Sequence, residues 1–64
     1  MNKHLFRAAM ARCGYTQQRL AKEIGMAQST MVRKVKKDAF TIHEANRIID
    51  ILKIENPEEI FFDI

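Results

Sequence analysis

Two side chains that can recognise nucleic-acid bases stand five positions apart near the middle of the chain, at Gln28 and Arg33. A glutamine amide can make two hydrogen bonds to adenine and an arginine guanidinium two to guanine, and each pair discriminates between bases by about 1–3 kcal/mol. Lys36 and Lys37 follow closely and carry charges that suit phosphate. These residue types allow base recognition, but outside a defined motif such side chains are more often simply solvated.

The charge of the chain is divided unequally along its length. Residues 1–37 hold nine basic side chains and one acidic side chain, a net charge of +8, whereas residues 38–64 hold two basic and seven acidic side chains, a net charge of −5. This asymmetry indicates a polyanionic partner for the first part, either nucleic acid or an anionic membrane surface. A solvated basic face without a partner explains the charge alone equally well.

The length and composition exclude several classes of protein. A chain of 64 residues is one small domain, 1–64. Cys13 has no second cysteine to pair with, and Cys and His do not cluster at zinc spacing. There is no glycine-rich phosphate loop, and no apolar run approaches the roughly 20 residues of a membrane span. We therefore expect a cytoplasmic protein that is not an enzyme and has no metal or cofactor.

Apolar residues recur at helical rather than strand spacing, which predicts an all-α fold of five short helices. The first helix ends at Gly14, and the second runs from an N-cap at Thr16 to a stop at Gly25. The third begins near residues 27–28, buries Met31 and Val35, and frays near residues 36–38. The inward positions of the first two helices are Leu5, Phe6, Ala9, Met10, Cys13, Leu20, Ala21 and Ile24.

The last two helices carry strong signals at their beginnings. Thr41 and Glu44 have the spacing of a capping box, in which each side chain accepts a hydrogen bond from a backbone N–H of the helix start. Asn56 is an N-cap candidate for a short final helix, and Pro57 suits its first position. The apolar residues at helical spacing on the fourth helix are Ala45, Ile48, Ile49 and Leu52, and those on the fifth are Ile60, Phe61 and Phe62.

Residues 16–37 have the layout of a helix-turn-helix, in which the second helix enters the major groove of DNA. A turn of three residues opens with Gly25, which can adopt the positive φ that a sharp reversal needs. Ala21 is small where the two helices must approach closely, and Met26 adds an apolar contact. This motif places Gln28 and Arg33 on the second helix.

In these residues the sequence resembles the lambda-repressor-like (Cro/cI-type) helix-turn-helix family, and the flanking helices resemble the five-helix domain of its small phage-type regulators. The resemblance implies a transcriptional regulator that binds double-stranded operator DNA, usually as a homodimer. Ala27 departs from the family pattern, because a polar cap often stands there, and Val35 as the late apolar position leaves the roles of Arg33 and Lys34 open. The matching residues are Gln17, Leu20, Ala21, Gly25, Gln28, Ser29, Thr30 and Met31.

We expect two sets of DNA contacts on this motif, and the acidic second part to complete the core and point away from DNA. Gln17 resembles the family's phosphate-binding glutamine, at a helix start that favours an anion. The expected base contacts are Gln28, Ser29, Val32 and Arg33, and the expected contacts to the sugar-phosphate backbone are Gln17, Gln18, Lys36, Lys37 and Thr41.

The apolar end of the chain leaves two alternatives open. Phe61, Phe62 and Ile64 could contact a second copy in a dimer, or they could close the core of the monomer. A second function class also fits the same fold, namely a protein-interaction module of the antitoxin or antirepressor type. That alternative would not need Gln28 and Arg33 on one face with a run of basic residues at 33–37.

Overall fold

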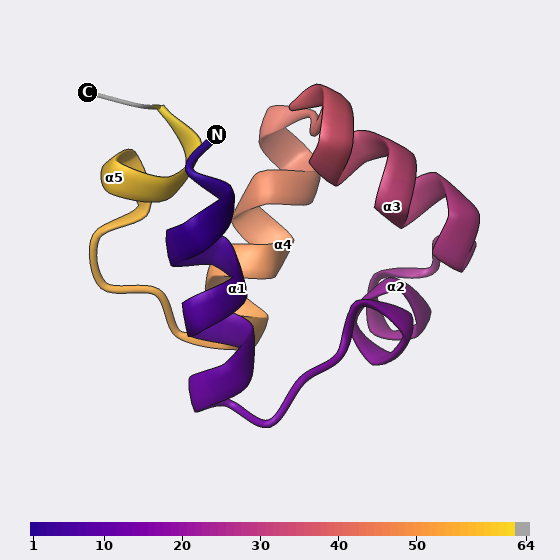
Figure 1. The fold of residues 1–64 in the computed structure, drawn as a ribbon, viewed down its shortest axis with the longest axis horizontal. Coiled ribbons are helices and arrows are strands. Elements are labelled where there is room, and N and C mark those ends of the chain that lie inside the picture. Colours follow the sequence, from indigo (N-terminus) through magenta and orange to yellow (C-terminus); the bar gives the residue numbers. More distant parts are fainter. Residues whose placement is uncertain (63–64) are drawn as a thin grey trace.

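A computed structural model of the chain describes residues 1–62 and shows five helices and no strand in that range (Figure 1). This confirms the expected all-α fold of five short helices. Ile64, an expected dimer contact, lies outside the described residues. The helices are α1 (Lys3–Arg12), α2 (Gln17–Ile24), α3 (Gln28–Lys37), α4 (Ile42–Leu52) and α5 (Pro57–Phe61).

Most of the helix ends lie where the local signals predict them. The Thr16 hydroxyl accepts a hydrogen bond of 3.1 Å from the Arg19 N–H and caps α2. Thr41 and Glu44 form the complete capping box of α4. Gly25 ends α2 with a φ of 77°, a conformation that costs other residues about 1–2 kcal/mol. These ends are set by short-range backbone chemistry.

The start of α5 differs from the prediction. The Asn56 side chain makes no capping hydrogen bond; instead its backbone carbonyl accepts a hydrogen bond of 3.2 Å from the Glu59 N–H. The backbone of Asn56 has φ −123° and ψ 70°, outside the extended conformation typical of an N-cap. Pro57 occupies the first helical position as expected, and Phe62 follows the helix rather than belonging to it.

The core takes apolar side chains from all five helices. Leu20 and Ala21 of α2 are buried as expected, whereas Ile24 and Met26 are only half-buried and pack against the core from its edge. No polar or charged residue among residues 1–62 is buried. The largest fully buried side chains are Phe6, Leu20, Met31, Ile48 and Leu52.

The helices divide into two groups around α4. The helix α2 packs against α3 and α4, and α1 packs against α5, so that α4 stands between the two pairs (Figure 1). The N-terminal segment also joins distant parts of the chain. The Asn2 N–H donates to the Ile60 carbonyl at 2.7 Å, and the Lys3 ammonium donates to the Lys36 carbonyl at 3.0 Å. The start of α1 is thus tied both to α5 and to the end of α3.

Capping α3 is expected to stabilise the domain. Ala27 has the extended N-cap conformation but no side-chain oxygen to accept a hydrogen bond from the helix start. The Ala27→Ser variant is therefore expected to gain about 1 kcal/mol in free energy of unfolding, measured by urea denaturation. Ala39→Ser, at an exposed position outside any helix, is the control and should change little. An equal effect of both substitutions would contradict the capping explanation.

Candidate nucleic-acid interface

The helices α2 and α3 are held at a defined angle by a short turn and a shared apolar contact. The turn spans residues 25–27, and the Met26 N–H donates to the Ala21 carbonyl at 2.9 Å, closing the end of α2. Ala21 is almost fully buried, and Leu20 and Met31 fill the space between the helices and the rest of the core. This arrangement holds α3 at the outer edge of the molecule, where one face is free of other helices (Figure 1).

The outer face of α3 carries the polar side chains that the sequence singled out. Met31 and Val35 are buried on the inner face, which leaves Val32 44% exposed and Arg33 exposed on the opposite side. No member of this outer face forms an ion pair within residues 1–62. The exposed positions share one side of the helix because they recur at helical spacing; they are Gln28, Ser29, Val32, Arg33 and Lys36.

The residues that are expected to contact the sugar-phosphate backbone border this face. They differ in their exposure and in whether their polar groups already make hydrogen bonds. Gln17 is half-buried at the first position of α2, Gln18 is exposed beside it, and Lys37 is exposed at the end of α3. Thr41 is exposed but occupied, because its hydroxyl accepts from the Glu44 N–H at 3.1 Å and its own N–H donates to the Glu44 carboxylate at 3.0 Å. The hydroxyl proton of Thr41 is the group left for a phosphate.

The helix starts of the first three helices differ from those of the last two. None of α1, α2 and α3 has an acidic residue in its first turn, whereas α4 has Glu44 and α5 has Glu58 and Glu59. The partial positive charge of a helix N-terminus favours an anion there. The starts of α2 and α3 therefore carry no acidic side chain that would oppose an anion.

Lys34 does not lie with the other basic residues of α3. Its ammonium contacts both carboxylate oxygens of Glu44 at 2.7 and 2.8 Å, and both side chains are half-buried. The basic run at 33–37 is therefore interrupted, because residue 34 falls on the side of α3 that meets α4. Glu44, from the acidic second part, thus lies at the α3–α4 junction and contacts the motif on the side away from the outer face of α3. One carboxylate caps α4 and also fixes α3 against it.

This junction makes the stability of the domain depend on pH. The hydrogen bonds from Lys34, and then from the Thr41 backbone, hold the pKa of the Glu44 carboxyl below its ordinary value. As the pH falls, the Glu44 carboxyl is therefore protonated in the unfolded chain before it is protonated in the folded one. The stability that the charged carboxylate contributes at neutral pH is lost as the pH falls below about 4.3.

The Glu44→Gln variant is expected to lack this contribution at pH 7 and to approach the wild type at low pH. Glutamine can keep the capping hydrogen bond, so the substitution tests mainly the charge. Urea denaturation of both proteins at pH 7, 5 and 3 measures the difference. A difference in unfolding free energy that is the same at all three pH values would contradict the assignment.

A second cluster lies along α2 and involves Tyr15, just before the helix, with Arg19 and Glu23 within it. The Tyr15 hydroxyl donates to the Glu23 carboxylate at 2.5 Å, which raises the pKa of Tyr15, and the Arg19 guanidinium lies 4.5 Å from the centre of the Tyr15 ring. These contacts fasten the loop between α1 and α2. Arg19 is thereby held beside an aromatic ring rather than in an ion pair.

An exposed basic helix, held across a second helix by a glycine turn, defines a helix-turn-helix DNA-binding domain. The comparison with known families identifies which one: the family model described as bacterial regulatory protein, Fis family, matches residues 2–37, which include α1, α2 and α3 and make up more than half of the chain. The chain belongs to the Fis family of bacterial regulatory proteins and is a DNA-binding transcriptional regulator of the helix-turn-helix class.

The comparisons with curated proteins and with solved structures gave no match. The family match confirms the helix-turn-helix part of the resemblance seen in the sequence, while the Cro/cI type goes beyond it. Within residues 1–62, no group of His, Cys, Asp and Glu residues could hold a metal ion, and no helix is long and apolar enough to cross a membrane.

Proposed function

We propose that the protein is a sequence-specific regulator of the phage Cro/repressor type, which occupies operator DNA by placing α3 in the major groove. One observation carries the proposal: the outer face of α3 is exposed, free of ion pairs within residues 1–62 and made of side chains that suit base edges. The major groove is wide enough for a helix and displays a distinct pattern for each base pair.

Each side chain of the outer face has a partner that suits its chemistry. Gln28 suits adenine and Arg33 suits guanine, since both can make paired hydrogen bonds. Val32 can pack on a thymine methyl group, and Ser29 can reach a base edge or a phosphate. The contacts to the sugar-phosphate backbone that we propose come from Gln17, Gln18, Lys36, Lys37 and Thr41.

The helices beyond the matched region support the Cro/repressor type. After the helix-turn-helix, α4 begins at a capping box that is bound to α3 through Lys34, and α5 closes the core with Ile60. This order of five short helices is the order of the domain that the sequence resembles. The regulator would then act by occupying its site and excluding or recruiting polymerase.

We also propose that the protein binds its operator as a dimer, because one motif of this size reads few base pairs. Among the described C-terminal side chains, Ile60 is buried and Phe61 is half-buried against the core. Phe62 is 56% exposed and is the described aromatic residue available for a second copy.

Sedimentation equilibrium can test the dimer. The wild type is expected to bind as two copies per operator, and Phe62→Ala is expected to weaken this association because it removes exposed apolar area from the contact. Ile42→Ala, another exposed apolar residue but at the start of α4, is the matched control and should leave the association unchanged. A wild type that is monomeric in solution and binds each operator as a single copy would exclude the dimer.

Selection of bound sequences from a random pool of DNA duplexes tests the function itself. We expect enrichment of a site with two similar half-sites about one helical turn, 34–36 Å, apart. A pool without enrichment, with weak binding to all duplexes, would instead favour the protein-interaction module.

A further inference from the structure

A basic hollow lies between the first three helices, next to the outer face of α3. Its volume is about 330 Å³, and half of its lining residues are cationic while none is acidic. The hollow is open to solvent, since several of the residues around it are exposed. The residues that line it are Lys3, Arg7, Gln17, Val32, Val35 and Lys36.

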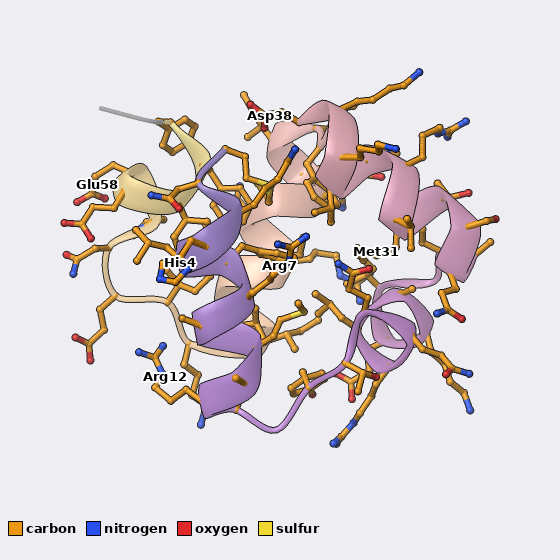
Figure 2. The ribbon with its side chains drawn as sticks, viewed as in Figure 1. His4, Arg7, Arg12, Met31, Asp38 and Glu58 are labelled. Carbon is orange, nitrogen blue, oxygen red and sulfur yellow. The ribbon has the colours of Figure 1, made fainter. Side chains whose placement is uncertain are left out.

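Arg7 brings α1 into this hollow. Figure 2 shows its side chain on the side of α1 that faces α3, whereas Arg12 lies on the opposite side of the same helix. The Arg7 guanidinium is exposed and makes no ion pair or hydrogen bond within residues 1–62. A guanidinium is planar and can bind two oxygens of a phosphate at once.

One contact and one helix start further define the hollow. The Lys3 ammonium donates to the Lys36 carbonyl at 3.0 Å, which joins the start of α1 to the last turn of α3. Gln17 stands at the first position of α2, a helix start without an acidic residue. The hollow therefore combines a free guanidinium, a lysine on each side and the positive end of a helix.

The position of the hollow indicates which anion it would meet. Val32 forms part of its wall and also belongs to the outer face of α3 that is proposed to contact bases. An anion in the hollow would therefore lie directly beside a recognised base pair, where DNA carries its backbone phosphates.

We propose that the hollow binds one phosphodiester of the DNA backbone, with Arg7 as its main ligand, so that α1 is part of the DNA interface. This inference rests on the proposed function, because the phosphate belongs to the DNA that α3 occupies. Val32 would then have a bound phosphate on one side and a base pair on the other. These two contacts together would limit the depth and the rotation of α3 in the major groove.

Arg12 provides a matched control on the same helix. It lines a different hollow, between α1 and α5, together with the acidic residues Glu55 and Glu59. Those carboxylates make that hollow unsuitable for a phosphate. Arg7→Gln and Arg12→Gln remove the same charge from exposed positions of α1, so they differ mainly in which hollow loses it.

The experiment measures binding to the selected duplex between 50 and 200 mM salt for the wild type, Arg7→Gln and Arg12→Gln. Each phosphate contact contributes about 0.9 to the slope of log affinity against log salt. We expect Arg7→Gln to reduce the slope by about that amount, so that its loss of affinity is about 3- to 4-fold greater at 50 than at 200 mM. Arg12→Gln should keep the wild-type slope, and Arg7→Lys, which keeps the charge, should restore it.

The outcomes separate the two proposals. If the wild type binds the duplex but Arg7→Gln and Arg12→Gln have the same slope, the phosphate site is wrong and the proposed function stands. If the wild type binds no duplex in a salt-dependent way, the proposed function fails and the phosphate site fails with it. Thermal unfolding of each variant confirms that the compared proteins are folded.

Discussion

The Met31→Ala variant is expected to lose about 2–5 kcal/mol of unfolding free energy, the range seen when a buried methionine or leucine is truncated. Met31 is 0% exposed on the inner face of α3 and belongs to the core cluster that joins all five helices. A domain of 64 residues has about 3–10 kcal/mol of stability in total. Urea denaturation followed by circular dichroism is therefore expected to find the variant largely unfolded or close to it.

Val32→Ala is the control for this prediction, since Val32 is the next residue of α3 and faces outward. Its unfolding free energy should stay within about 0.5 kcal/mol of the wild type, as is usual for exposed positions. If Met31→Ala unfolded at the wild-type urea concentration, α3 would not be anchored as the structure has it. The pair thus tests which side of α3 belongs to the core and which side is free for DNA.

The Arg33→Ala variant is expected to lose discrimination at one base pair, by about 1–3 kcal/mol or about 5- to 150-fold in relative affinity. The reason is that Arg33 is exposed on the outer face of α3 without an ion pair among residues 1–62, so its guanidinium is free to bind a base edge. The measurement compares affinities for the selected site and for variants changed at single positions, all at one salt concentration.

Lys37→Ala separates base recognition from general attraction to DNA. This exposed lysine at the end of α3 is proposed to contact phosphate, so its loss should weaken binding to all sequences about equally and reduce the salt slope. If Arg33→Ala and Gln28→Ala both kept the sequence preference of the wild type, α3 would not read bases. The protein-interaction module would then be the better hypothesis.

The basic residues of α3 have two different environments, so they do not all contribute to the exposed positive charge of residues 1–37. Lys34 neutralises Glu44 at the junction with α4, whereas Arg33 and Lys36 remain exposed on the other side of the helix. The junction fixes the helix, and the exposed face is left to meet a ligand. A single helix therefore combines an anchored side and a binding side.

Local signals were sufficient for most helix boundaries. Thr16, Gly25 and the capping box of Thr41 and Glu44 act on backbone groups within three or four residues, so their effect can be read from spacing alone. Asn56 shows the limit of this reasoning. Its backbone, with φ −123° and ψ 70°, departs from the extended N-cap conformation, and its side chain makes no hydrogen bond to the helix start.

The sequence by itself determined the five helices, the helix-turn-helix at residues 16–37 and the buried positions Met31 and Val35, because helical periodicity and capping are properties of neighbouring residues. Tertiary structure alone decided that Lys34 turns to Glu44, that Phe62 stays exposed, and that Arg7 shares a hollow with α3. Each of these depends on the angle and distance between helices. Those are set by how the whole core packs, which no local spacing contains.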